Sequence, residues 1–176
     1  MLALALAAPA HALAEVELTA DLSVGGGAIV TGDRRPALAR FGGHAEATFL
    51  RDSNRDVGVG VYCEAMTSSF ENVMGGVGVL ALFPVHRALP LVLFLGPHYV
   101  YSGEHDAGLG GRLWFGLHNH NDLHPYNGTL GIWVEVRADL THDRDVLIGA
   151  GLDIDPGLFV YPFLWLERWA RGPRRL

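Results

Sequence analysis

The chain has 176 residues, which suits a single domain, and 49% of them are hydrophobic while 18% are charged. Its formal net charge is −6 and no basic stripe runs along it, so the composition argues against a nucleic-acid partner. A single cysteine, Cys63, excludes an intrachain disulfide, and we interpret it as a small apolar residue within a strand.

Residues 1–14, MLALALAAPAHALA, have the pattern of a secretory signal peptide. A short apolar run ends in Ala12-Leu13-Ala14, which has small residues at the two positions that precede a cleavage site. The positively charged start of such signals is missing, and an ordinary N-terminal helix is the alternative. No run reaches the roughly 18 apolar residues of a spanning helix. We therefore expect an exported protein, either periplasmic, secreted or built as an outer-membrane barrel.

Eight stretches alternate between apolar and polar or small residues with a period of two, which is typical of β-strands. We predict strands over residues 15–24, 39–49, 57–66, 73–83, 91–101, 107–118, 130–140 and 146–155. Gly25, Gly26 and Gly27 are expected to loosen the first strand at its end. Pro97 is expected to mark a bulge or an edge, because proline cannot donate to a strand ladder. The fifth stretch departs from this alternation, because it is apolar on both faces.

The connections between these stretches are mostly short and contain no helical pattern. Parallel strands would need long crossovers, so successive strands must be antiparallel neighbours. A meander of eight twisted strands closes naturally into a barrel. We therefore predict an all-β fold, an eight-stranded antiparallel up-and-down β-barrel over residues 15–155, followed by a short C-terminal helical segment within residues 156–176.

The C-terminal segment is aromatic first and basic afterwards. Pro162 suits the first turn of a helix, and Phe163, Leu166 and Trp169 follow at helical spacing. One interpretation is a helix that lies on a membrane interface, where aromatic and arginine side chains are common. The other is a helix that caps the barrel or packs in its mouth.

Two kinds of barrel fit the alternation. A soluble, lipocalin-like barrel points apolar residues inward and binds an apolar ligand, whereas a membrane barrel points them at lipid. Here the polar face mixes glycine with large charged residues, as a narrow interior requires, and the apolar face is too continuous to be left in water. Outward aromatics fall near strand ends, where membrane barrels carry girdles: Phe49, Phe83, Tyr99, Tyr101 and Phe115. We favour the membrane barrel, with lipid as its partner, over a periplasmic barrel.

This pattern resembles the small eight-stranded outer-membrane barrels of the OmpA transmembrane-domain and OmpX type. The resemblance covers about residues 15–155 and is architectural, because it carries no family motif. It implies a place in the bacterial outer membrane and a structural or interaction role. Other eight-stranded outer-membrane barrels are lipid A deacylases and palmitoyltransferases, which makes lipid A modification a further alternative.

The polar face predicts a charge network inside the barrel. Its members would be Glu46, Glu64, Arg112, Glu135, Arg137, Asp139 and Asp153. Buried charges must pair, so we interpret the set as a satisfied salt-bridge network, with a proton or ion path as the alternative. Counting back from the loop after residue 118 places Arg112 and Glu135 at similar depth, so they can pair across strands.

A histidine cluster is the other candidate site. His118, His120 and His124 have a spacing that suits a metal ion, since imidazole is a common ligand, although a solvated loop explains the same residues. No serine lies nearby in the sequence, which argues against a Ser/His/acid site. We therefore expect no catalysis and no cofactor, and the sequence does not identify a protein partner.

Overall fold

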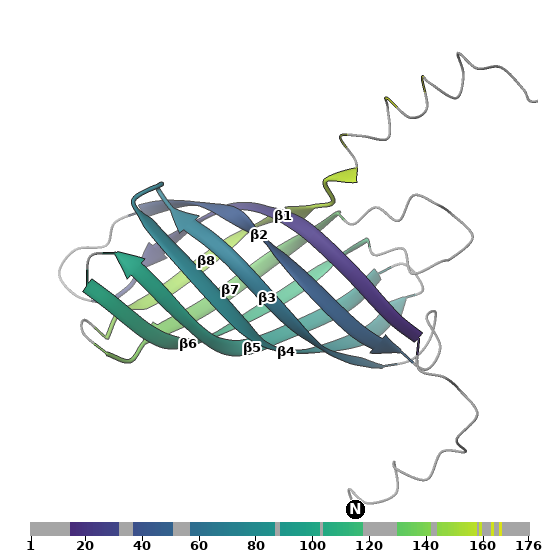
Figure 1. Cartoon of the computed structure of the whole chain (residues 1–176), viewed down its shortest axis with the longest axis horizontal. Coiled ribbons are helices and arrows are strands. Elements are labelled where there is room, and N and C mark those ends of the chain that lie inside the picture. The colour runs from purple at the N-terminus through teal and green to yellow at the C-terminus, as the bar shows by residue number, and fades with distance from the viewer. Residues whose placement is uncertain are drawn as a thin grey trace, which may run out of the picture.

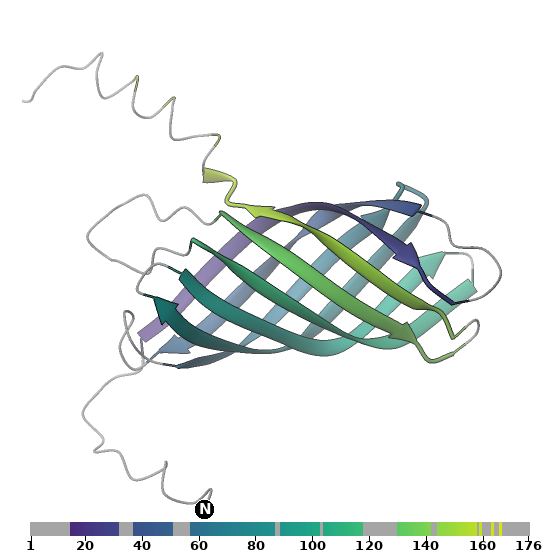
Figure 2. The ribbon, with the colours of Figure 1, turned by 180° about the vertical axis from the view of Figure 1, so that it is seen from behind.

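The chain folds into a closed barrel of eight antiparallel strands, each paired with its neighbours in sequence, and β8 closes against β1 (Figures 1 and 2). The computed structural model describes residues 15–31, 37–50, 57–86, 89–102, 104–117, 130–141, 144–157, 159, 163 and 166. The predicted fold class is confirmed. The strands are β1 (Glu15–Ile29), β2 (Ala37–Leu50), β3 (Gly58–Ser68), β4 (Asn72–His86), β5 (Leu89–Ser102), β6 (Glu104–Leu117), β7 (Leu130–Asp139) and β8 (Val146–Ile154).

The three consecutive glycines do not loosen β1, which is a correction to the sequence-based expectation. The strand continues through Gly25–Gly27 to Ile29, and these residues pair with β2 on one side and β8 on the other. Two complete ladders hold a glycine backbone extended even though glycine itself has a low strand preference. The absence of side chains here instead makes room for Trp133 of β7, as described below.

Pro97 marks neither a bulge nor an edge. It lies inside β5 in unbroken register with β6, and the pairs with β4 keep one register on both sides of it. The register shift between β4 and β5 lies between Pro84 and His86 instead. Proline removes one donor but inserts no residue, so the ladder resumes unchanged beyond it. In a closed barrel β5 also has no free edge.

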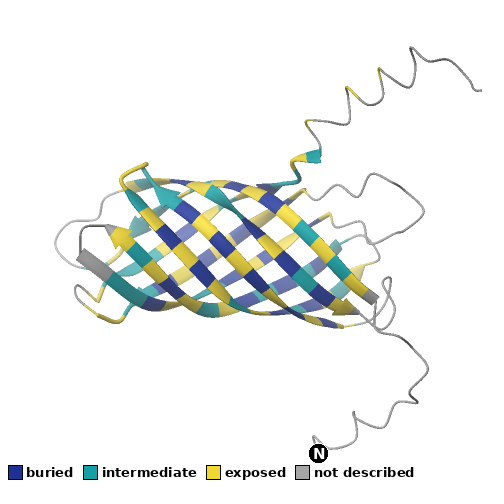
Figure 3. Cartoon of the chain, in the orientation of Figure 1, coloured by how far each residue is buried: buried dark blue, intermediate teal, exposed yellow. Residues whose placement is uncertain are grey.

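Burial alternates residue by residue along the strands (Figure 3), and many of the exposed residues of the outer face are large hydrophobic ones. On β7, Trp133 and Glu135 are 1% and 2% exposed, whereas Val134 between them is 53% exposed. The same alternation runs along β3 from Gly58 to Met66. This polarity is that of a membrane barrel, because a soluble barrel would place its valines and leucines inside.

The interior is filled by side chains rather than left open. One side of it is apolar, built mainly from β3 to β7: Tyr62, Met66, Met74, Leu80, Leu82, Val92, Phe94, Trp114 and Trp133. The strands β4 and β5 supply Leu80, Leu82, Val92 and Phe94, which explains why the fifth strand reads as apolar on both faces. Their inward residues pack the interior while their outward residues cover the wall.

The barrel has two distinct rims. The terminal rim is the end where β1 begins and β8 ends, and the turn rim is the opposite end, which carries the turn 69–71 and the connection between β7 and β8. At the turn rim, Ser69 and Phe70 have positive φ angles of 52° and 61°. Phe70 stacks on Phe41 with ring centroids 5.1 Å apart, and this contact helps to hold a backbone conformation that bulky residues seldom adopt.

At the terminal rim, the chain turns directly after β8. The Gly157 amide donates to Asp155 Oδ1 at 2.6 Å, and the Phe159 amide donates to the Pro156 carbonyl at 3.1 Å. Gly157, Phe159, Phe163 and Leu166 have helical backbones, and the other residues of the predicted C-terminal helix lie outside the described part of the chain. No helix within that part is long and apolar enough to cross a membrane.

The glycines under Trp133 generate the first prediction. A Cβ at Gly25 would lie 2.7 Å from Trp133 Cζ2 and even closer to the Ala150 carbonyl oxygen, whereas a Cβ at the outward Gly75 would meet nothing within 4 Å. We expect Gly25→Ala to lower the free energy of unfolding by about 1–3 kcal/mol through overpacking. Gly75→Ala should leave it nearly unchanged. Urea midpoints of both variants in one detergent measure this, and equal midpoints would contradict the packing described here.

Candidate functional site: a charge network inside the barrel

Three arginines converge on one carboxylate in the middle of the barrel. Glu135 of β7 forms ion pairs with Arg40 of β2 at 2.9 Å, with Arg137 of β7 at 2.8 Å and with Arg112 of β6 at 3.6 Å. The Arg137 Nε also donates to Glu135 Oε2 at 2.9 Å. Because Glu135 and Arg137 are two residues apart on one strand, they share the inward face.

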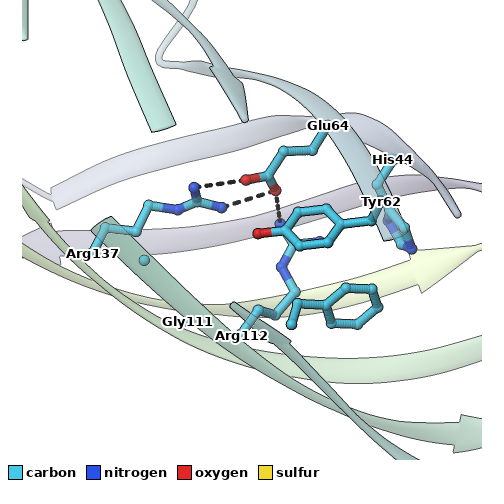
Figure 4. Close-up of a pocket in the computed structure, with 8 residues that line it drawn as sticks. His44, Tyr62, Glu64, Gly111, Arg112 and Arg137 are labelled. Carbon is cyan, nitrogen blue, oxygen red and sulfur yellow. Dashed lines mark hydrogen bonds and ion pairs between the residues drawn. The ribbon is translucent and has the colours of Figure 1, made fainter. Parts of the chain in front are cut away.

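Glu64 of β3 is the second carboxylate of the network. Arg137 reaches it across the lumen with two parallel hydrogen bonds, Nη1 to Oε1 at 2.7 Å and Nη2 to Oε2 at 2.9 Å (Figure 4). Arg112 donates to Glu64 Oε2 at 3.2 Å. The paired geometry matches the planar guanidinium to the carboxylate and is the strongest form of this contact. It links strands β3 and β7, which are not neighbours in the barrel wall.

Asp153 of β8 extends the network toward β1. It lies 3.8 Å from Arg112 Nη1 and accepts a hydrogen bond from the Ser23 hydroxyl. His44 of β2 lies between Asp153 and Asp21, with ring nitrogens 3.8 Å and 3.7 Å from their carboxylate oxygens. Each of these side chains is almost fully buried, so these contacts between neighbouring strands are made away from bulk water.

Arg112 is also held by an aromatic ring. Its guanidinium carbon lies 4.9 Å from the ring centroid of Trp133, which is a cation–π geometry. Trp133 itself fits against Gly25 and Gly151 of the two closing strands. The indole ring therefore supports the arginine on one side and seals the β1–β8 junction on the other.

The structure brings together five of the seven residues that the sequence places in the interior network, namely Glu64, Arg112, Glu135, Arg137 and Asp153. Arg112 and Glu135 are direct partners in the β6–β7 ladder. Glu46 is buried on β2, opposite Thr19 and Tyr62 in the neighbouring strands. Asp139 lies nearer the turn rim, where its Oδ1 is 2.8 Å from His98 Nε2.

Several participants were not singled out from the sequence. Arg40, Asp21 and Ser23 join the network, and His98 pairs with Asp139. A signal existed for Arg40, Asp21 and Ser23, since each falls on the polar face of an alternating stretch, whereas His98 lies on the fifth stretch, which is apolar on both faces. The alternation identifies the face but does not show which of its members approach one another across the lumen.

The predicted histidine cluster, His118, His120 and His124, lies outside the described residues. Within the described ranges, no group of three or more His, Cys, Asp or Glu side chains has an arrangement that could hold a metal ion.

The network leaves little free volume. A cavity of about 10 Å³ lies between its members and the aromatic side, lined by His44, Tyr62, Glu64, Phe94, Gly110, Gly111, Arg112 and Arg137. That is close to the room that one water molecule needs. This cavity therefore has space for about one bridging water, and it is too small for an organic ligand.

No protein-family model and no curated protein sequence matches this chain. A solved structure that does match is that of Ail, the attachment invasion locus protein of Yersinia pestis, in complex with the heparin analogue sucrose octasulfate. The TM-score is 0.53 at 12% sequence identity, and the match covers 80% of this chain and 97% of that one. At this identity the likeness shows the fold alone, and it confirms the architectural resemblance to small eight-stranded barrels.

The second prediction concerns Arg137, whose loss would leave Glu64 and Glu135 short of one positive partner. Arg137→Gln should lower the free energy of unfolding by about 3–5 kcal/mol, because an uncompensated charge would remain buried. Arg144→Gln, in an exposed turn, is the matched control and should have almost no effect. Urea unfolding of both variants, and of Glu64→Gln with and without Arg137→Gln, checks this. Purely additive losses in that cycle would contradict the pairing of Glu64 with Arg137.

The third prediction concerns ion flow. Because the described interior is filled by the charge network and its aromatic side, the reconstituted protein should show no steady ion conductance in a planar bilayer. The combined substitution Arg112→Ser with Trp133→Ala removes two large side chains and should raise the conductance above that of the parent. A steady conductance of the parent protein would show that the interior opens.

Proposed function

We propose that this chain is a small integral β-barrel of the bacterial outer membrane, with a structural or interaction role and without catalysis. The observation that carries the proposal is the polarity of the wall. Buried carboxylates and guanidinium groups line the inside, while valine, leucine and isoleucine cover the outside. In water, an outer face of this kind would be a very large exposed apolar patch, which soluble monomers avoid.

Aromatic side chains at both rims support a membrane setting. Phe49, Phe83 and Phe115 point outward near the terminal rim. Phe41, Phe70, Tyr99 and Tyr101 do so near the turn rim. Along β2, the spacing from Phe41 to Phe49 corresponds to about 27 Å of strand and, at a tilt of about 40°, to about 21 Å along the barrel axis. That height is close to the apolar band of outer-membrane barrels, which is about 25 Å.

The periplasmic, lipocalin-like alternative fits the geometry poorly. Such a barrel needs an apolar chamber for its ligand, and here the centre is occupied by Arg40, Arg112, Arg137 and their carboxylate partners. The cavity among them is about 10 Å³ and is lined partly by charged groups. An apolar ligand would have to displace paired charges, which costs several kcal/mol for each ion left without its partner.

An interaction role rests on the likeness of fold to Ail. The name of that protein refers to attachment and invasion, and it was crystallised with a polyanion. The charge of this chain does not favour the same kind of ligand, a polyanion. In the sequence, the turn-rim segments 30–36, 69–71, 103–106 and 141–145 contain six acidic residues and three arginines. Like charges repel, so this rim would disfavour a polyanion such as a heparin analogue.

The fourth prediction uses the native cysteine as a probe. Cys63 is exposed on the outer face of β3, between Ala45 and Val77 in the neighbouring strands. In lipid vesicles, a charged maleimide should label it far more slowly than it labels Arg144→Cys, at the turn rim, in a Cys63→Ser background. The rate should recover when the vesicles are dissolved and the protein is denatured.

Rapid labelling of Cys63 in intact vesicles would contradict the membrane setting, and so would a soluble monomer without detergent after removal of residues 1–14. A change in the mass of lipid A on expression would instead favour a lipid-modifying barrel over a structural or interaction role.

A further inference from the structure

The chain leaves the barrel with an exposed apolar stripe. Phe159, Phe163 and Leu166 have helical backbones and are 61%, 70% and 53% exposed. Their spacing of four and three residues places them on one face of a helix. Large apolar side chains gain free energy when they leave water, so a stripe of this kind calls for an apolar surface to cover it.

The centre of the barrel interior, as far as the structure describes it, does not offer such a surface. Its described cavity is about 10 Å³, which is far smaller than a single aromatic side chain. Around this cavity lie the buried charge network and the buried indole rings of Trp114 and Trp133. A segment that entered the lumen would displace paired charges, so the alternative of a C-terminal plug is disfavoured.

The outer wall beside β8 is the place where the segment begins. Ile154, the last residue of β8, is in register with Leu22 of β1 and Leu130 of β7. Both of these leucines point outward and are nearly half exposed. The strand β1 extends seven residues beyond Leu22 toward the terminal rim, since its pairing with β2 starts at Glu15. The chain therefore emerges beside lipid-facing side chains and not out in free solution.

The charge of the segment indicates which lipids it would meet. After Glu167 the sequence carries Arg168, Arg171, Arg174 and Arg175 and no acidic residue, in a chain whose net charge is −6. Arginine stems lie along apolar surface while their guanidinium groups reach phosphate oxygens. Each arginine near an anionic surface contributes about a fivefold preference for it, from roughly 1 kcal/mol per charge.

We propose that residues 158–175 dock on the surface of the membrane leaflet at the terminal rim. The apolar stripe lies in the boundary between headgroups and acyl chains, and the arginines bind the phosphates of anionic phospholipids. The inference rests on the proposed function, because it requires the barrel to lie in a bilayer. It adds a second, electrostatic attachment to the wall of the barrel and fixes which rim faces anionic lipid.

The test places an environment-sensitive dye at Phe163→Cys in the full chain with Cys63→Ser, reconstituted in phosphatidylcholine vesicles with or without phosphatidylglycerol. With phosphatidylglycerol, we expect strong quenching by headgroup-level spin-labelled lipid and protection from aqueous iodide. Replacing Arg168, Arg171, Arg174 and Arg175 by glutamine should abolish most of the difference between the two vesicle types. The same dye at Arg144→Cys is the control and should remain accessible to iodide.

Two outcomes would overturn the docking proposal: accessibility of the dye at position 163 to iodide in both vesicle types, or equal protection in both. A dye on the native Cys63 of the otherwise unchanged chain separates these from a failure of the proposed function. Quenching of that dye by deep spin-labelled lipid shows that the barrel spans the bilayer whatever position 163 reports. Access of iodide to Cys63 would instead overturn the proposed function itself.

Discussion

The cost of holding ions away from water governs this structure. A guanidinium group buried without a partner costs several kcal/mol, so each of the three interior arginines must reach a carboxylate. Glu135 meets Arg40, Arg112 and Arg137, which come from β2, β6 and β7. The network therefore ties together strands on different sides of the barrel. It also specifies register, because a slip of one residue in any of these strands would turn the charges of that strand toward the outer face.

The rest of the interior is arranged around these charges. The apolar side, with Leu80, Phe94 and Trp114, fills the space that the network leaves, and Trp133 lies between the two regions. Trp133 supports Arg112 on one face and occupies the space above Gly25 and Gly151 at the closure of the barrel. A large ring placed against glycine lets two strands approach closely without a void. The result is a filled barrel, which suits a structural or interaction role better than transport.

The outer surface has the character that the same rule predicts for a barrel placed in a bilayer. A closed barrel satisfies its backbone groups strand to strand and leaves no open edge along the paired wall, which is what a bilayer demands of any structure that spans it. Its outward side chains can then be uniformly apolar. Beyond the last strand, Phe159, Phe163 and Leu166 are exposed as well.

The sequence by itself determined the eight strands, their antiparallel order and the face to which each residue belongs, because side chains alternate with a fixed period of two. It also indicated that Arg112 and Glu135 lie at one depth, since a single loop joins their strands. Only the tertiary structure decided that Arg137 reaches Glu64, 73 residues away, and that Asp139 meets His98 instead. Contacts across the lumen depend on how far each strand is staggered when the barrel closes, and local alternation carries no record of that stagger.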